Sequence, residues 1–581
     1  MPEKSNPVDV LVVGAGPVGL VSAYQLARFG GGSVSVRIVE KHTKTVQDTY
    51  GRAVTLFPRT SEMLDQLELA DPLLQHGFAC RDTAAYDAQG QEVHGRGWSF
   101  LHDMKDTAFD FALVLRQKYQ EEAFRAAMKP LGVEVEAPVE LTAVTSINDE
   151  GSDGDDYRVT AVIRNRETGE EETVKCKYLI ACDGGHSTVR RLLEIPLEGS
   201  ATEDRWVRVD GLVKTDLPKP RTYCAIESPT HGNVLWVALD RGTTRIGYAY
   251  TPAPDEQQAL LFDQAAAVRG AIAAVKPFTL AFERVDWWTI YTVSQRVAAH
   301  FRAAHGRVLL AGDAAHTHSS AAAQGMNTGV HDAVNLGWKL AVALRHPARA
   351  DALLRTYEAE RRPHVLRLIR YDRDISQLMS GRLPEGWAGE ADVSAALARA
   401  MREAGRFSSG LGIAYEVAGG NPLNVVGSFV GGAAPGVRAP DVELLRPGTC
   451  EPTRLIRETR NVARFHVLVF ASDGAPGIPA AVFRELEGSV PIQGLVAEGC
   501  LAFVTVLPDP VPSAYEVLDH EPLGRVYFGA KDKSTYSRFG IEIGKGAIAV
   551  VRPDGWIGTM VVLGSGAAAE IEAYFGNIFT I

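Results

Sequence analysis

Gly14-Ala-Gly-Pro-Val-Gly19 is the stretch of sequence that decides the fold of this chain. It follows an apolar run at residues 8–13, opens a segment with helical spacing at residues 18–29, and precedes a β-branched run at residues 34–39. In such a turn the first glycine permits a tight bend, the second lets the backbone approach a pyrophosphate, and the third lets helix and strand pack closely. Glu40, after the second run, can accept hydrogen bonds from a ribose diol. This βαβ unit predicts a dinucleotide site and does not by itself distinguish FAD from NAD.

The composition is that of a globular protein with more than one structural unit. The 581 residues exceed the size at which a single core keeps growing, and 46% of them are hydrophobic. A net charge of -11 gives no basic surface for nucleic acid or anionic lipid, so neither is an expected partner. Six cysteines without CxxC spacing are typical of free thiols in a reducing compartment. With no signal-peptide or transmembrane pattern, we expect a cytoplasmic protein that does not enter a membrane.

The pattern along the chain predicts an α/β fold in which two kinds of sheet are interleaved. Residues 206–250 consist of short alternating runs separated by turns, which favours an antiparallel sheet. Helical spacing returns at residues 327–344 and 352–380, and a Pro/Gly-rich linker at residues 433–440 precedes further strands and helices. The predicted domains are a Rossmann-like dinucleotide-binding domain at residues 1–205 and 291–385, a substrate-binding sheet domain at 206–290, a helical connection at 386–432 and an α/β domain at 433–581.

Two further motifs narrow this prediction. Cys182-Asp-Gly-Gly-His-Ser-Thr-Val-Arg190 and Gly312-Asp-Ala-Ala-His316 each follow a predicted buried strand, and Gln324-Gly-Met-Asn327 begins a predicted helix. In this order, and together with the glycine turn, these motifs resemble the FAD-dependent aromatic hydroxylases built on the p-hydroxybenzoate hydroxylase fold. The resemblance implies FAD as the cofactor, NADPH or NADH as a transient reductant, and O2 and a small aromatic molecule as substrates.

The same resemblance assigns roles to residues in these motifs. The second motif would lie near the FAD phosphates, and the third would contact the ribityl chain. Backbone N–H groups at the start of the following helix would face the pyrimidine edge of the flavin, because a helix N-terminus favours the negative charge of the reduced ring. The expected FAD-binding residues are Gly14, Gly16, Gly19, Glu40, Arg52, Gln117, Asp183, Gly184, Gly312, Asp313, Gly325, Met326 and Asn327.

Within that family the chain is most similar to the phenol hydroxylase branch. The similarity includes residues 286–296 and extends to the C-terminal region, which in that branch is a thioredoxin-like domain. Tyr291 matches a family tyrosine that faces the substrate, with an ordinary aromatic on a half-buried strand as the competing interpretation. Arg284 is a second candidate for holding a phenolate or carboxylate. The C-terminal domain has no CxxC, so we expect it to serve packing or homodimer formation.

Two positions depart from the pattern of the branch. Val54 stands where an acidic residue often serves as the base for the phenol, so the sequence leaves open how the substrate is deprotonated. Ser320 stands in a segment, Ser319-Ser-Ala-Ala-Ala323, in which a proline usually lies beside the flavin. That second departure leaves the geometry beside the oxygen-reacting edge open.

The function predicted from these observations is hydroxylation of a phenolic or related aromatic ring by an FAD-dependent monooxygenase. The resemblance implies that NAD(P)H reduces FAD and that oxygen is transferred through a flavin C4a-hydroperoxide. Oxidative decarboxylation with hydroxylation, or epoxidation of a polyketide- or terpenoid-type ring, is a second hypothesis, and a non-catalytic flavin-binding interaction protein is a third. No metal is expected, because no acidic or cysteine partners are grouped with His316, His318 and His331.

Overall fold

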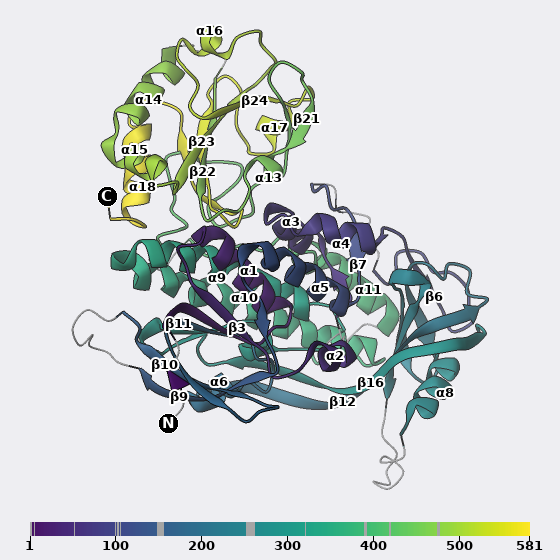
Figure 1. Ribbon diagram of the computed structural model, residues 1–581. Coiled ribbons are helices and arrows are strands. Elements are labelled where there is room, and N and C mark those ends of the chain that lie inside the picture. Colours follow the sequence, from purple (N-terminus) through teal and green to yellow (C-terminus); the bar gives the residue numbers. More distant parts are fainter. Residues whose placement is uncertain are drawn as a thin grey trace.

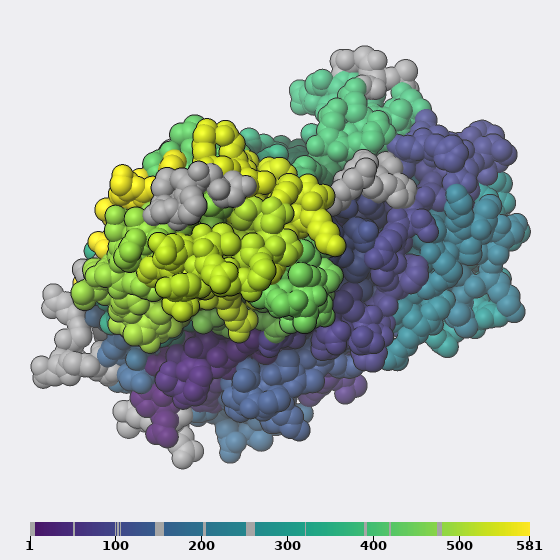
Figure 2. Space-filling view, turned by 90° about the horizontal axis from the view of Figure 1, so that it is seen from above, coloured from purple at the N-terminus to yellow at the C-terminus, as the bar shows by residue number. Residues whose placement is uncertain are grey.

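The computed structural model has a large N-terminal part with two sheets and a smaller C-terminal domain. Figure 1 shows the C-terminal domain, green to yellow, above a layer of helices, with the strands of the N-terminal part on the other side of that layer. Viewed from above, the C-terminal domain covers one side of the molecule and leaves the other uncovered (Figure 2). The structure describes residues 3–4, 6–50, 53–98, 100–101, 104, 106–147, 156–250, 262–319, 321–387, 392–417, 420–472 and 477–580.

The predicted βαβ unit forms the centre of the first sheet. β18, β11, β2, β3 and β8 lie side by side in that order and run parallel. Because the carboxyl ends of parallel strands meet at one edge of a sheet, the turns after β2, β11 and β18 come together there. These turns carry the three motifs of the sequence. The strands of the sheet are β1 (Glu3–Lys4), β2 (Val8–Val13), β3 (Val36–Val39), β8 (Val135–Glu136), β9 (Val139–Ile147), β10 (Val159–Asn165), β11 (Glu171–Ala181), β17 (Arg302–Ala303) and β18 (Val308–Leu310).

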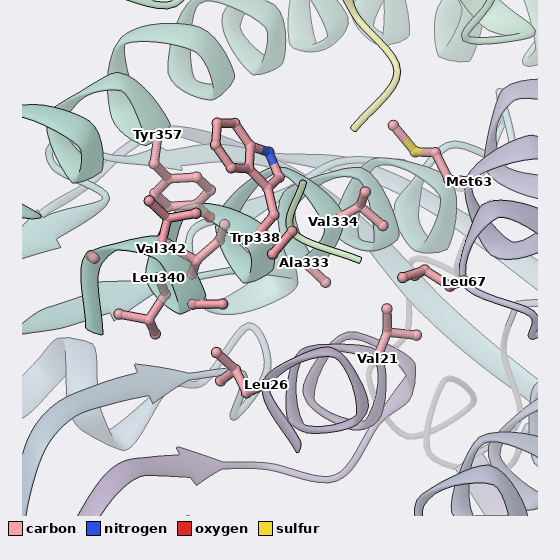
Figure 3. Packing of buried hydrophobic residues seen from close by; sticks show 14 of the residues in the cluster. Val21, Leu26, Met63, Leu67, Ala333, Val334, Trp338, Leu340, Val342 and Tyr357 are labelled. Atoms are coloured by element: carbon pink, nitrogen blue, oxygen red, sulfur yellow. The ribbon is translucent and has the colours of Figure 1, made fainter. Parts of the chain in front are cut away.

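Six helices pack together over this sheet and share the main hydrophobic core with it. They are α1 (Pro17–Gly30), α3 (Pro58–Gln66), α4 (Ala70–His76), α5 (Gln117–Met128), α9 (Gly325–Arg345) and α10 (Ala350–Met379). Val21 of α1, Trp338 of α9 and Tyr357 of α10 belong to one buried cluster (Figure 3). α1 and α9 approach closely because a Cβ on Gly329 would lie only 2.6 Å from Cγ2 of Val18. This close contact fixes the start of α9 relative to the first glycine turn.

The second sheet is antiparallel except for its edge pair, β13 and β6. β12 and β16 have 19 residues each and extend beyond the predicted substrate-binding domain, residues 206–290. β12 begins before residue 206 and β16 ends after residue 290, because the two strands continue as a ladder into the dinucleotide-binding part. Helix α8 (Gln264–Ala274) packs on one face, and the other face turns toward the start of α9. The strands lie in the order β19 (His316–Thr317), β16 (Leu280–Ala298), β12 (Leu197–Thr215), β15 (Thr244–Tyr250), β14 (Gly232–Ala238), β13 (Tyr223–Ser228) and β6 (Thr83–Tyr86).

The connection predicted to be helical at residues 386–432 is helical only in part. It contains α11 (Val393–Glu403) and α12 (Gly405–Ser408), whereas residues 409–417 and 420–432 contain no helix. A small sheet nearby joins β4 (Thr55–Leu56), β5 (Phe78–Cys80) and β7 (Ala112–Val114). Glycines and prolines are frequent in the second half of the connection, and they disfavour a continuous helix.

The C-terminal domain has the strand order of a thioredoxin-like fold. β22, β23 and β24 are parallel, β25 is antiparallel to β22, and β26 completes a hairpin with β25. The predicted fold class, two interleaved sheets followed by a third α/β domain, is confirmed. No helix among the described residues has the length and apolar character needed to cross a bilayer. The strands and helices of this domain are β20 (Glu443–Leu445), β21 (Pro452–Arg454), α13 (Leu455–Glu458), β22 (Phe465–Phe470), α14 (Gly477–Gly488), α15 (Val490–Ala497), β23 (Leu501–Leu507), α16 (Ala514–Leu518), β24 (Arg525–Gly529), α17 (Ser534–Ser537), β25 (Ala547–Val551), β26 (Ile557–Val562) and α18 (Ala567–Gly576).

Candidate active site

The glycines of the first turn serve two different purposes. Gly14 has a φ of +100°, and a Cβ on it would lie 2.3 Å from the carbonyl oxygen of Cys182. A Cβ on Gly19 would lie 1.9 Å from the carbonyl oxygen of Gly14. Around a Cβ on Gly16, in contrast, none of the surrounding described residues places an atom within 4 Å. Gly14 and Gly19 are therefore needed for packing, whereas Gly16 keeps the backbone accessible from the cavity that it lines.

That cavity, of about 220 Å³, lies at the carboxyl edge of the parallel sheet. The carboxylate of Glu40 accepts hydrogen bonds from the backbone N–H groups of Ala15, at 2.9 Å, and His42, at 3.0 Å. The side chain of Gln117, at the start of α5, donates to Glu121 at 2.8 Å. The structure thus brings together predicted residues from four separate segments. Those that line the cavity are Gly14, Gly16, Glu40, Gln117, Asp183 and Gly184.

The two carboxylate oxygens of Asp183 differ in their hydrogen bonding. Its Oδ2 accepts hydrogen bonds from the backbone N–H groups of Thr188, at 2.7 Å, and Val189, at 3.1 Å, at the start of α6 (Thr188–Leu192). Its Oδ1 is buried and has no hydrogen-bond partner among the described residues. A buried acceptor without a partner costs about 1–3 kcal/mol, so a ligand that donates to this oxygen is favoured. Gly184 follows with a φ of +83°, which only glycine adopts readily.

The third motif is anchored by a buried carboxylate that the sequence did not single out. The backbone N–H of Gly312 donates to Oδ2 of Asp332, on α9, at 3.1 Å. The same carboxylate contacts Nε2 of His316 at 2.6 Å and Nε of Arg361 at 2.7 Å. Burial alone would raise the pKa of Asp332, but His316 and Arg361 outweigh it and lower that pKa to about 2. This anchor leaves the side chain of Asp313 exposed beside the turn.

The start of α9 offers its backbone rather than its side chains to a ligand. Oδ1 of Asn327 accepts hydrogen bonds from the backbone N–H of Phe57, at 2.8 Å, and the hydroxyl of Thr60, at 2.7 Å. Its Nδ2 donates to the carbonyl oxygen of Thr55 at 3.0 Å. Met326 is buried in the main core, and Gly325 has no side chain. At the start of this 21-residue helix, the backbone N–H groups are therefore the groups that can bind an anionic ligand.

A second buried cluster, rich in aromatic rings, lies between the antiparallel sheet and the start of α9. The rings of Phe57 and Trp98 are stacked with centroids 6.1 Å apart, and Trp98 lies 4.8 Å from Tyr223. Val54 is buried in this cluster, and Tyr291 packs against it. Its members include Val54, which precedes β4, Trp206, Tyr223, Leu235, Val237 and Val293 of the antiparallel sheet, and Ala321 and Ala322 of the segment before α9.

Arg208 brings a positive charge to the border of the aromatic cluster. Arg208 is 4% exposed, and its NH2 group donates to the hydroxyl of Tyr291 at 3.2 Å. A Cβ on Gly247 would lie 2.6 Å from this guanidinium, so the glycine leaves room for it. Nearby, the hydroxyls of Tyr223 and Thr55 are hydrogen-bonded at 2.9 Å. Burial raises the pKa of Tyr223, against the opposing effects of Thr55 and Arg208.

The structure does not place Arg284 with Tyr291. Both lie on β16, but they are seven residues apart, roughly 23 Å along an extended strand. The Arg284 side chain is 61% exposed and forms an ion pair with Asp286 at 2.5 Å. Arg208 stands beside Tyr291 instead, and only the register of β12 against β16 reveals this proximity. Arg52 and Ser320 lie outside the described residues.

The three histidines of the third motif and α9 have partners within the protein. His316 contacts Asp332, His318 donates from Nδ1 to the carbonyl oxygen of Ser319 at 3.0 Å, and His331 contacts the hydroxyl of Thr60 at 3.0 Å. The group of potential metal ligands found among the described residues lies elsewhere and consists of His346, Glu498 and Cys500, with donor atoms within 4.8 Å of one another.

Comparison with known proteins decides the family. Residues 7–372 match the family model described as FAD binding domain, and residues 517–581 match that of the phenol hydroxylase C-terminal dimerisation domain. The chain belongs to the FAD binding domain family. It is 33% identical to 6-methylpretetramide 4-monooxygenase of Streptomyces rimosus over 82% of this chain and 81% of the relative. It is 28% identical to 3-hydroxybenzoate 4-monooxygenase of Comamonas testosteroni over 98% of this chain and 94% of the relative.

Solved structures agree with this assignment. The anhydrotetracycline hydroxylase OxyS from Streptomyces rimosus superposes with a TM-score of 0.67 at 26% identity, covering 98% of this chain and 99% of the other. The predicted class, an FAD-dependent monooxygenase with a phenol hydroxylase-like C-terminal domain, is confirmed, and its cofactor is FAD. The residues present fit this cofactor, because Gly16 leaves the turn accessible and Asp183 retains a buried oxygen that can accept a hydrogen bond.

Proposed function

We propose that this FAD-dependent monooxygenase hydroxylates a phenolic or related aromatic ring. The observation that carries the proposal is the buried aromatic cluster beside the start of α9, with Arg208 and the hydroxyl of Tyr291 at its border. An aromatic ring gains free energy by entering such a cluster, and its oxygen substituent finds a hydrogen-bonding partner there. The balanced reaction consumes the ring substrate, O2, NAD(P)H and a proton, and gives the hydroxylated ring, water and NAD(P)+.

The predicted FAD-binding residues would each contact a different part of the cofactor. The backbone at Gly16 takes the pyrophosphate, Glu40 takes the ribose diol, and Oδ1 of Asp183 accepts a hydrogen bond from the middle of the molecule. Asp313 would hold the ribityl chain, and the backbone N–H groups that begin α9 would interact with the reduced flavin's negative charge. FAD, when bound, supplies the activation of O2 and the transfer of one oxygen atom to the ring.

The side chains at the border of the aromatic cluster hold the phenolic oxygen. Val54 cannot act as a base, so the chain must favour the phenolate by other means. The Arg208 guanidinium stabilises a negative charge in a site of low dielectric constant, which lowers the pKa of a phenol bound there. The hydroxyl of Tyr291 accepts a hydrogen bond from Arg208, and a phenolic hydroxyl can also donate its own proton to a phenolate oxygen.

The test is a screen of phenols with the purified yellow protein. A productive phenol should accelerate NADPH oxidation and yield a product that has gained one oxygen atom from labelled O2. The variant Arg208→Gln should raise the KM for the same phenol at least about tenfold, the effect of losing one charged hydrogen bond. If phenols accelerate NADPH oxidation but every product lacks the label, hydroxylation is ruled out.

A polycyclic ring of the polyketide type is a second candidate substrate. It is favoured by the similarity to 6-methylpretetramide 4-monooxygenase and to an anhydrotetracycline hydroxylase. A polycyclic phenol and a monocyclic hydroxybenzoate, compared at equal concentration, separate the two candidates. The polyketide proposal requires that kcat/KM be larger for the polycyclic compound.

We also propose that the protein is a cytoplasmic homodimer. The match to a dimerisation domain supports the dimer, as do exposed valines on neighbouring C-terminal segments, Val426, Val430 and Val562. The six cysteines form no disulfide, which supports a reducing compartment. Light scattering on the eluting protein tests the dimer, and Val430→Asp should shift the mass toward the monomer if this face is the interface.

A further inference from the structure

A second cavity lies at the junction between the antiparallel sheet and the dinucleotide-binding part. Its volume is about 580 Å³, within the range of about 300–1,000 Å³ for small-molecule and cofactor sites. One wall consists of the start of α5 and residues 48–49, and the other is formed by β16 with its neighbours. Its basic and aromatic side chains are Arg116, Lys118, Tyr119, Arg241, Arg284 and Trp287. Three carboxylates also line it, Asp48, Asp210 and Asp286, and each is paired with a lysine or arginine.

The positive charges of this cavity are not equivalent. Arg116 is matched by Asp240, at 2.7 Å, and by Asp286, which also binds Arg284. Lys118 and Arg241 have no carboxylate partner within the described parts of the chain. Both lie against one ring, since Nζ of Lys118 is 5.0 Å and the guanidinium of Arg241 is 4.0 Å from the centre of Tyr119. The cavity therefore presents two cations and an aromatic ring at one place.

This cavity adjoins the FAD cavity along two stretches of chain. Gln47 and Gln117 line the FAD cavity, and the residues that follow them directly, Asp48 and Lys118, line the second one. On the opposite wall, Trp287 and Tyr291 lie four residues apart on the same face of β16, roughly 13 Å from each other. A ligand the size of a dinucleotide that binds in the second cavity is therefore long enough to extend to the side of the sheet that carries Tyr291.

We propose that this cavity is the docking site of the nicotinamide reductant, and that Lys118 and Arg241 select NADPH by binding its 2′-phosphate. The inference rests on the proposed function, which requires a reductant. An arginine binds phosphate in a forked arrangement, and an arginine near the ribose is the common means of accommodating a 2′-phosphate. The ring of Tyr119, which lies beside both cations, adds apolar surface against which the ribose and adenine can pack. The nicotinamide end then extends along the Trp287 wall toward the flavin.

A binding experiment on the holoenzyme tests the site without turnover. Titration calorimetry with NADP+ and NAD+ is carried out on the wild type, on the double variant Lys118→Gln/Arg241→Gln, and on the control Lys214→Gln. Lys214 is an exposed cation, paired with Glu283, on the same pair of long strands and outside the cavity. The Kd for NADP+ should rise at least about thirtyfold in the double variant, from two lost phosphate contacts, and remain unchanged in the control. The Kd for NAD+ should change little in both.

Rapid mixing with NADPH separates docking from chemistry. The concentration dependence of flavin bleaching should give a higher Kd for NADPH in the double variant, with the same limiting rate of reduction at saturation. The proposed site is overturned if the double variant binds NADP+ with the same Kd as the wild type and also binds NADPH with the same Kd as the wild type. If the wild-type flavin is reduced by neither nicotinamide in the presence of productive or candidate phenols, the proposed function itself fails. Binding of NADP+ that depends on Lys118 and Arg241 would still establish the site in that case.

Discussion

Among single residues, Gly16 and Gly19 lie three positions apart in one turn, but the space around them for a side chain differs. A methyl group on Gly19 would collide with the carbonyl oxygen of Gly14, whereas one on Gly16 meets none of the surrounding described residues. We expect Gly19→Ala to lower the melting temperature of the FAD-free protein by several degrees, because backbone atoms must move apart. Gly16→Ala should leave that temperature unchanged and weaken FAD binding by at least about tenfold. Melting curves and FAD titrations of both apoproteins give the comparison, and equal melting temperatures would contradict the assignment for Gly19.

Asp332 makes stability depend on pH. Its pKa in the folded protein, about 2, is below the ordinary value near 4, so folding favours the charged form. That contribution, on the order of 2 kcal/mol, is present above about pH 4 and is lost as the pH falls toward 2. We expect Asp332→Asn to reduce the free energy of unfolding by about 3–5 kcal/mol at pH 7, because Arg361 loses its buried partner. Denaturant titrations at several pH values should show the difference between wild type and variant constant down to about pH 5 and smaller below. A difference independent of pH down to pH 3 would contradict the pKa assignment.

At the scale of elements, the first turn of α9 is held in place by one amide side chain. Asn327 joins that turn to β4 and to the start of α3. Its replacement by Ala should cost about 3 kcal/mol of stability in the FAD-free protein, since several buried groups lose partners. Asp313→Asn, at an exposed side chain, should change the apoprotein by less than about 0.5 kcal/mol and weaken FAD binding. Denaturation of the two apoproteins, followed by FAD titration, separates the structural residue from the binding residue.

The elements around the site were predictable where local signals are strong. α10 occupies residues 350–379, close to the predicted 352–380, and the three motifs lie at the ends of parallel strands. The predicted start of α9 at residue 327 was two residues late, because Gly325 is a weak helix former whose place depends on packing. Arg208 and Asp332 were not predicted as site residues. The contact of Arg208 with Tyr291 spans 83 residues, and only the tertiary pairing of β12 with β16 creates it.

At the scale of the whole molecule, the two domains are joined by a buried network of charges. Arg552, in the tip between β25 and β26, reaches Glu360 of α10 at 2.6 Å and Asp554 at 2.7 Å. Lys339 of α9 contacts the same Glu360 at 2.7 Å, and the indole N–H of Trp338 donates to Asp554 at 2.9 Å. Burial, opposed by Glu360, lowers the pKa of Lys339 to about 8. Since these charges are withdrawn from water, Arg552 and Glu360 each depend on the partner contributed by the other domain.

Because of this network, a single substitution that weakens the attachment of the C-terminal domain should also destabilise the FAD-binding part. In Arg552→Met, Glu360 and Asp554 lose the guanidinium that they share, which should cost about 3–5 kcal/mol. Arg525, exposed in the same domain, is the matched control, and Arg525→Met should cost less than about 1 kcal/mol. Limited proteolysis should cut residues 409–417 faster in Arg552→Met than in the control, because Leu411, Ile413 and Tyr415 are buried there and become accessible when the domains separate more often. If both variants are cut at the wild-type rate while Arg552→Met unfolds at lower denaturant, the network stabilises the α9 and α10 pair rather than the attachment of the domain.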